Sequence, residues 1–301
     1  MPETVLSAGL SVGGALSRGR AALQAAGCDT PRLDAELLAA AALGLSRERL
    51  LLDRDGCPDQ GALDRFEALL ARRAAREPVA YILGRKAFRH ISLAVDRRVL
   101  IPRPETELLV EVGLTLGAGA AVVDVGTGSG AVALALKDER PDLFVSGTEL
   151  SADALAVGRS NALRLGLDVR LVQADLLDSG QYDAVLANLP YVPDGSVLAP
   201  EIALYEPLGA LFAGADGLDV IRRLVSMLGQ RADDAQSVPE PGQRIFYSFG
   251  GEAARRASLL ALEVGSEQAA SVASLMHRSR WASVEILRDL AGHERVVVGR
   301  R

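Results

Sequence analysis

An apolar run leads directly into a glycine-rich turn near the middle of the 301-residue chain. Residues 122–125 are typical of a buried strand, and Gly126, Gly128 and Gly130 follow them before a helical stretch at residues 131–137. Glycine allows positive φ and leaves the backbone bare, while the amides at a helix N-terminus point outward. The turn therefore indicates a strand-turn-helix unit that binds a nucleotide-type cofactor.

Further runs of β-forming residues alternate with helical stretches from residue 120 onward. The runs cover residues 121–125, 143–148, 169–172 and 182–187. Such alternation predicts an α/β fold with a doubly wound, mostly parallel sheet. Residues 282–287 and 295–298 are separated by a turn, and we expect them to form an antiparallel edge.

Residues 229–258 interrupt this alternation with Pro239, Pro241 and several glycines, and we interpret them as an atypical insertion. Two short runs flank or lie within it, at residues 245–249 and 259–264. Either of them could supply the fifth strand, because short apolar runs do not distinguish the two.

The first part of the chain has a different texture. Between residues 10 and 76, apolar residues return every three or four positions, Thr30-Pro31 is typical of a helix start, and Gly44 of a helix end. A small all-α bundle is predicted there. After Pro78, partial alternation at residues 91–101 suggests a short strand pair. We therefore expect a helical domain at residues 1–80, a linker with a strand pair at 81–104, and a catalytic domain at 105–301.

Composition limits the possible partners. The formal net charge is -6 and the pI is about 5.3, so a nucleic acid is not expected as the direct substrate. The two cysteines, Cys28 and Cys57, form neither a disulfide framework nor a metal-like spacing. His90, His277 and His293 lack partner spacing and are expected at the surface or in turns. With no export signal or apolar span, we expect a cytoplasmic monomer that binds no membrane and no metal.

The spacing of the glycines resembles a known cofactor-binding motif. Gly-x-Gly-x-Gly resembles motif I of the class I methyltransferases more than the Gly-x-Gly-x-x-Gly of nicotinamide enzymes, which implies S-adenosylmethionine. Glu149 ends the next strand, where a carboxylate can accept hydrogen bonds from ribose hydroxyls. Asp175 follows the third strand, where adenine contacts or a helix cap are expected. The expected cofactor residues are Gly126, Thr127, Gly128, Ser129, Gly130, Glu149, Asp175, Leu176 and Asn188.

A second motif follows the fourth strand, at the edge where open α/β sheets bind ligands: Asn188, Leu189, Pro190 and Tyr191. An amide nitrogen is a poor nucleophile and must be held with both hydrogens engaged. The Asn188 side-chain oxygen and the Leu189 carbonyl can accept them, and Tyr191 can pack over the planar group. These four residues are therefore expected to bind the substrate and to take part in methyl transfer to a planar nitrogen. Adenine N6 and a glutamine amide satisfy the motif equally.

Nearly the whole chain resembles the HemK/PrmC-type release-factor glutamine N5-methyltransferases. The resemblance rests on residues 78–88, on Ile101-Pro-Arg-Pro-Glu-Thr-Glu107, and on the two motifs above, with further matches at residues 206–211 and 294–299. It implies an N-terminal domain that recognises the substrate protein. It also implies methylation of the glutamine in the Gly-Gly-Gln motif of peptide chain release factors.

Three neighbouring residues extend this site. The resemblance suggests that Leu100 lines the glutamine slot. Arg103 and Glu105 either form part of the active-site wall or mark a proline-braced helix entry.

This chain has Leu189 where the family usually has proline. Asn-Leu-Pro-Tyr also occurs in ribosomal RNA adenine dimethyltransferases, so an adenine N6-methyltransferase of RNA or DNA is one alternative. A ribosomal protein glutamine is a second possible target. A cofactor-binding scaffold without activity is a third alternative, suggested by Leu189 and the insertion at residues 229–258.

Overall fold

The computed structural model describes residues 10–234 and 257–301, and the chain divides into two units. The helical unit comprises the chain up to Arg85 together with Leu198–Tyr205, and the sheet unit comprises Lys86–Val197 and Glu206–Arg301. The alternative fifth strand at residues 245–249 lies outside the described residues.

Short-range capping explains why the helical unit forms where the periodicity predicts it. Ser11 Oγ accepts a hydrogen bond from Gly14 N, and Asp59 Oδ1 accepts one from Ala62 N, which begins two of the helices. Gly44 adopts φ 67° at a helix end, as expected. The helices are α1 (Val12–Ala25), α2 (Pro31–Leu43), α3 (Arg47–Leu52), α4 (Gln60–Ala74) and α5 (Val79–Leu83). Thr30 precedes α2, but its hydroxyl donates to Asp34 instead of capping the helix.

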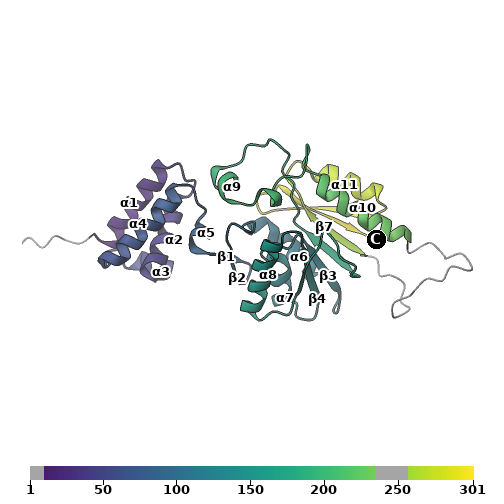
Figure 1. Ribbon diagram of the computed structural model, residues 1–301, viewed down its shortest axis with the longest axis horizontal. Coiled ribbons are helices and arrows are strands. Elements are labelled where there is room, and N and C mark those ends of the chain that lie inside the picture. The colour runs from purple at the N-terminus through teal and green to yellow at the C-terminus, as the bar shows by residue number, and fades with distance from the viewer. Residues whose placement is uncertain (1–9, 235–256) are drawn as a thin grey trace, which may run out of the picture. The chain divides into compact units, whose positions relative to one another are not determined.

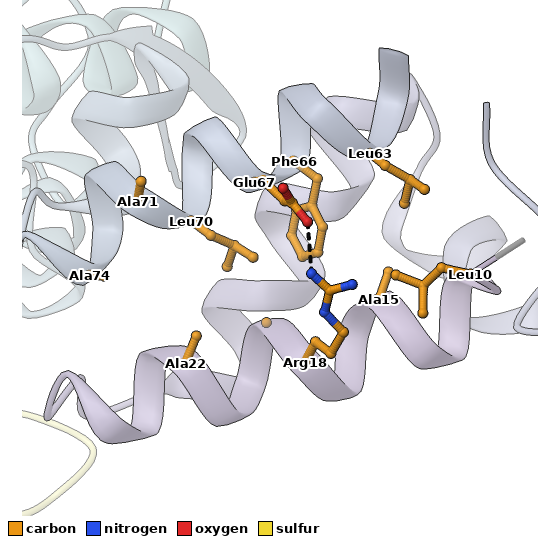
Figure 2. A pocket seen from close by; sticks show the side chains of 11 residues that line it. Leu10, Ala15, Arg18, Ala22, Leu63, Phe66, Glu67, Leu70, Ala71 and Ala74 are labelled. Atoms are coloured by element: carbon orange, nitrogen blue, oxygen red, sulfur yellow. Dashed lines mark hydrogen bonds and ion pairs between the residues drawn. The ribbon is translucent and has the colours of Figure 1, made fainter. Parts of the chain in front are cut away.

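A groove of ≈ 330 Å³ runs between α1 and α4, and its lining is mostly apolar (Figure 2). Gly19 lies at the close approach of these helices, because a Cβ there would stand 2.9 Å from the Phe66 ring. Arg18 and Glu67 form an ion pair of 2.8 Å across the groove, with both side chains more than half exposed. Such an exposed pair contributes little to stability.

A buried ion network holds Leu198–Tyr205 within the helical unit. This segment contains helix α9 (Pro200–Tyr205), and its Glu201 accepts from Arg73 at 2.9 Å and from Arg76 at 2.7 Å. Arg73 is 6% exposed and also pairs with Asp34 at 2.7 Å. Because the Arg73 guanidinium is shared by two carboxylates, its charge is compensated despite burial.

The sheet unit contains a seven-stranded sheet with strand order β5-β4-β3-β6-β7-β9-β8. The strands are β3 (Ala121–Val125), β4 (Phe144–Glu149), β5 (Arg170–Gln173), β6 (Ala184–Ala187), β7 (Leu259–Glu263), β8 (Ser283–Arg288) and β9 (Glu294–Arg300). Strands β3 to β7 pair in parallel, while β9 runs antiparallel to both β7 and β8. The predicted doubly wound, mostly parallel sheet with an antiparallel edge is confirmed, and residues 259–263 supply the fifth strand.

Helices cover both faces of this sheet (Figure 1). One face carries α6 (Glu107–Leu114), α7 (Ala131–Glu139) and α8 (Ala152–Leu165), and the other carries α10 (Asp219–Asp234) and α11 (Ala269–Arg278). Alternation within the strands assigns their side chains to these faces. Val185 and Leu260 pack into the core with α10 and α11, whereas Leu186 lies against α6. Helix α10 continues to Asp234, so the first residues of the expected insertion at 229–258 are helical.

The expected strand pair near residues 91–101 begins earlier than the alternation suggested. Strand β1 (Arg85–Phe88) pairs with β2 (Ile91–Ala94), so only the start of the predicted stretch is a strand. The 3₁₀ helix η1 (Pro104–Thr106) then leads into α6. Among the described residues, no helix is long and apolar enough to span a bilayer.

We predict that Arg73→Ala destabilises the helical unit by about 3–5 kcal/mol, because it leaves the buried carboxylate of Asp34 without its cation and removes one of the two partners of Glu201. Hydrogen exchange of amides in α2 and α4 measures this loss. Arg18→Ala is the matched control and should cost less than about 1 kcal/mol, because its ion pair is exposed. Equal losses in the two variants would contradict the role given to the buried network.

Candidate active site

Three loops meet at the carboxyl edge of the parallel strands. In the sheet register, Val125 of β3 lies beside Thr148 of β4 and Ala187 of β6. The residues that follow these positions, which are Gly126, Glu149 and Asn188, therefore lie at the same level of the sheet. The two motifs found in the sequence are brought together at this edge.

The glycine turn depends on backbone conformations that other residues rarely adopt. Gly126, Gly128 and Gly130 have φ of 72°, 55° and 85°. A Cβ on Gly126 would stand 3.2 Å from Leu189 Cδ2 and 3.7 Å from the Asn188 carbonyl oxygen. The missing side chain at Gly126 thus allows the glycine turn to lie directly against the second motif.

A buried carboxylate braces the turn from below. Asp124 Oδ2 accepts from Thr127 Oγ1 at 2.6 Å and from Ala133 N at 3.2 Å. Burial raises the pKa of Asp124 to about 6, although these hydrogen bonds oppose the shift. Asn161, fully buried, donates to the Ser129 carbonyl and so ties the other end of the turn to α8.

Glu149 lies against the glycine turn. Its Oε2 accepts from Gly128 N at 2.9 Å, and its Oε1 accepts from Ser151 N at the same distance. A carboxylate has about four acceptor positions, so these two bonds leave capacity for further donors. Helix α8 also approaches the turn closely, because a Cβ on Gly158 would stand 2.9 Å from the Gly128 carbonyl oxygen. Bare glycine backbone with a carboxylate beside it fits a ribose-bearing cofactor.

The two residues expected near the adenine occupy different environments. Asp175 is exposed, and its carboxylate pairs with Arg223 at 2.6 Å. Leu176 is buried and has φ 67°, which is uncommon for a residue with a side chain. Strained backbone is often found at ligand sites, and both residues stay predicted cofactor contacts.

Asn188 is oriented by a hydroxyl at the start of α6. Its Nδ2 donates to Thr106 Oγ1 at 3.0 Å. Thr106 is buried and ends η1. With one amide hydrogen engaged by Thr106, the side-chain oxygen of Asn188 is available as an acceptor.

The residues after Asn188 are held by the core. Leu189 is 4% exposed and belongs to the cluster that includes Leu262, whereas Pro190 is half-buried. The backbone carbonyl of Tyr191 accepts from Gln268 Nε2 at 2.9 Å, and its hydroxyl donates to Glu263 Oε1 at 3.3 Å. Burial raises the pKa of Tyr191, so its hydroxyl remains a donor at neutral pH.

Glu263 is a buried site residue that sequence reasoning missed. In the register, Ala187 pairs with Leu262, so Asn188 and Glu263 follow at the same level, on the face that carries α6. Burial raises the pKa of Glu263 to about 7, while the neighbouring Thr106 hydroxyl and the hydrogen bond from Tyr191 oppose the shift. A signal was present in the sequence, since Glu263 is the one charged residue in the apolar run of residues 259–264.

Of the remaining predicted residues, Arg103 pairs with a second buried carboxylate, Glu206. It is 5% exposed, accepts from Ile101 N at 3.2 Å, and forms an ion pair with Arg103. Arg103 therefore braces the segment before α6, while Leu100 and Glu105 are half-buried beside it. Of the three histidines, His293 lies in the turn before β9, near Asp289. The described residues contain no cluster of side chains suited to a metal ion.

The fold and this edge define a class I methyltransferase. The defining features are the strand order, the glycine turn after β3 and the Asn188 loop after β6. In addition, residues 104–203 match the sequence-family model described as the methyltransferase small domain. The hMettl16 catalytic domain in complex with MAT2A 3'UTR hairpin 6 has the same fold, with a TM-score of 0.54 and 14% identity over 77% of this chain and 81% of that one.

Sequence comparison specifies the family. Residues 14–84 match the sequence-family model described as the PrmC N-terminal domain. The release factor glutamine methyltransferase of Rhodospirillum rubrum is 37% identical, with 100% of this chain and 88% of that protein covered. That of Nitratidesulfovibrio vulgaris is 38% identical, with 96% and 94% covered. The chain belongs to the family of release factor glutamine methyltransferases.

We predict that Glu263→Gln changes the free energy of unfolding more favourably at pH 8 than at pH 4. The pKa of Glu263 is raised from 4.5 to about 7 in the fold, so its stabilising effect is complete below about pH 4.5 and is lost as the pH rises through 7. Removing the charge should raise the free energy of unfolding at pH 8 by up to about 3 kcal/mol relative to the change at pH 4. Urea denaturation at the two pH values measures it. Asp124 is unchanged in both proteins, so its own titration cancels, and a pH-independent difference would contradict the assignment.

Proposed function

We propose that this protein transfers a methyl group from S-adenosylmethionine to the side-chain amide nitrogen of a glutamine in a peptide chain release factor. The observation that carries the proposal is the placement of Asn188 at the carboxyl edge, beside the glycine turn, with its Nδ2 engaged by Thr106. Family membership supports the substrate class, since the relatives carry the name release factor glutamine methyltransferase.

The residues around the glycine turn would hold the cofactor. Gly126, Gly128 and Gly130 offer bare backbone, and Glu149 offers acceptor positions for ribose hydroxyls. Leu176 contributes a strained backbone at the end of the next strand. When bound there, the cofactor supplies an electrophilic methyl group on a sulfonium.

The second motif would prepare the amide nitrogen. Asn188 Oδ1 accepts one N–H and the Leu189 carbonyl accepts the other, which fixes the plane of the amide and turns the lone-pair direction toward the methyl group. The nitrogen would accept the methyl group that the bound cofactor supplies and would then carry a positive charge. The nitrogen, now cationic, releases a proton to solvent, so this chain needs no strong general base. Replacement of the usual proline by Leu189 leaves the backbone acceptor in place.

The helical unit would recognise the protein substrate, which the match to the PrmC N-terminal domain at residues 14–84 supports. A contribution from α9 is consistent with this role. The segment begins seven residues after Tyr191, yet Arg73 and Arg76 hold it within the helical unit.

Glu149→Ala is expected to weaken binding of S-adenosylmethionine roughly 10- to 100-fold, the effect of losing hydrogen bonds to a charged group. Isothermal titration calorimetry measures the Kd. Asp175→Ala is the matched control, because the exposed Asp175 already pairs with Arg223, and it should change the Kd much less. A larger effect at Asp175 than at Glu149 would overturn the assignment of the ribose position.

Intact-mass measurement tests the reaction itself. After incubation with cofactor and this protein, a purified release factor should gain the mass of one methyl group, and a release factor without the Gly-Gly-Gln glutamine should gain none. Asn188→Ala should slow the transfer by about 100-fold or more, because it removes an acceptor that is aligned with the reacting group.

Leu163→Ala, which changes an exposed residue on α8, is the control for Asn188→Ala and should retain the wild-type rate. Transfer that persists on the release factor lacking its glutamine would contradict the proposal. Methylation of a ribosomal protein, with release factors unmodified, would redirect it to the other glutamine target.

A further inference from the structure

Glu206 is a buried carboxylate to which neither the glycine turn nor the second motif assigns a role. Its side chain is 1% exposed, and the residue lies between α9 and the 3₁₀ helix η2 (Leu208–Ala210). Oε2 accepts from Ile101 N at 3.2 Å, and Oε1 accepts from Arg103 Nη2 in an ion pair. Both oxygens are therefore engaged by the segment that precedes α6. A buried ion pair adds little net stability compared with apolar packing, so stability alone does not account for this one.

A short, stiff turn connects Arg103 to the residue that holds Asn188. Arg103 directly precedes η1, Pro104 begins it, and Thr106 N donates to the Arg103 carbonyl at 3.2 Å. Proline fixes φ, and a hydrogen-bonded 3₁₀ turn leaves the chain little freedom. The position of Arg103 therefore determines the position of the Thr106 hydroxyl, which accepts from Asn188 Nδ2 at 3.0 Å.

A second connection leads from Glu206 to the other end of the same motif. Pro207 follows Glu206 and precedes η2, and Leu211 comes directly after that turn. Leu211 is buried, and its carbonyl accepts from Val192 N at 2.8 Å. Val192 is the residue after Tyr191, so the segment that begins at Glu206 also fixes the end of the second motif.

These contacts close a ring that holds the second motif at both ends. One side of the ring runs from Glu206 through η1 to Asn188, and the other runs from Glu206 through η2 to Val192. We infer that Glu206 is a positioning residue for the methyl transfer, which sets where the Asn188 side chain lies relative to the substrate amide. This inference rests on the proposed function for the identity of the substrate.

The two bonds of Glu206 require a carboxylate. A glutamine at position 206 offers one acceptor oxygen and one NH₂ group, and the NH₂ group would face either Ile101 N–H or the Arg103 guanidinium, which are both donors. One of the two contacts is therefore lost, and the segment before α6 is free to shift. Because a displacement of about 1 Å can lower a rate roughly 100-fold, the loss should appear in the transfer step.

The experiment compares Glu206→Gln and Arg103→Lys with the control Glu285→Gln, all in the full chain. At saturating cofactor, kcat for release-factor methylation should fall roughly 10- to 100-fold in Glu206→Gln. Arg103→Lys keeps the cation beside Glu206 but loses the planar guanidinium, so it should cause a smaller fall. Glu285 pairs with Arg300 at 3.3 Å and is more than half exposed, so its variant should retain the wild-type rate. The Kd of S-adenosylmethionine should be unchanged in all three.

A double-mutant cycle distinguishes positioning from general support of the fold. If Glu206 acts partly through the Thr106 hydroxyl, Glu206→Gln and Thr106→Val damage the same ring, and their losses in kcat should combine to less than the product of the two. Losses that multiply in full would show that Glu206 acts independently of Thr106, and they would overturn the inference.

A further readout does not require turnover. The side-chain amide signals of Asn188 in ¹⁵N-edited NMR, assigned by their loss in Asn188→Ala, should shift in Glu206→Gln and Arg103→Lys but not in Glu285→Gln. Unshifted Asn188 signals, or wild-type kcat in Glu206→Gln, would contradict the inference. If Glu206→Gln does not fold, Arg103→Lys, which retains both charges, decides by the same two readouts. A wild type that methylates no release factor, but whose Asn188 signals respond to these variants, would overturn the proposed function and support the positioning role.

Discussion

The close approach of two backbone segments at the carboxyl edge of the sheet determines the rest of the site. Gly126 has no side chain; a Cβ there would crowd Leu189 Cδ2 at 3.2 Å and would reach contact distance of the Asn188 carbonyl oxygen. Parallel pairing of β3 with both β4 and β6 brings these loops to one level, and the core fixes Leu189 from below. The glycine turn and the loop that contains Asn188 are thereby adjacent, as the proposed methyl transfer between two bound molecules requires.

Two buried carboxylates, Asp124 and Glu263, maintain this edge at the expense of stability. Burial raises the pKa of each, to about 6 and about 7. Asp124 is satisfied by Thr127 and by a backbone amide of α7, so its cost is partly offset. Glu263 is satisfied less completely. Both lie under the loops that would touch the ligands, which is where proteins commonly retain unfavourable electrostatics because function depends on them.

The sequence predicted local features better than relationships between distant ones. Periodicity and turn residues specified the strands that carry the site, and the glycine spacing located the cradle beside Glu149. The partnership of Asn188 with Thr106 spans 82 residues, and it arises from sheet register and helix placement, which local patterns do not encode. Glu263 was visible as a charge in an apolar strand, but its meaning depended on knowing that β7 lies next to β6. The attachment of α9 to the helical unit had no local signal, because it depends on the distant Arg73.

The excursion of Leu198–Tyr205 has an architectural consequence. The chain enters the sheet unit after Arg85, leaves it for the helical unit at Leu198 and returns at Glu206, so the helical unit is discontinuous in sequence. It is not a module that a single recombination event could exchange. If the helical domain came from a relative, the arginines of that domain would have to pair with Glu201 of the recipient chain. The helical domain and the segment Leu198–Tyr205 are therefore constrained to change together. Genetic fusion or swapping at this family's apparent domain boundary would therefore separate a carboxylate from the buried cations that compensate it.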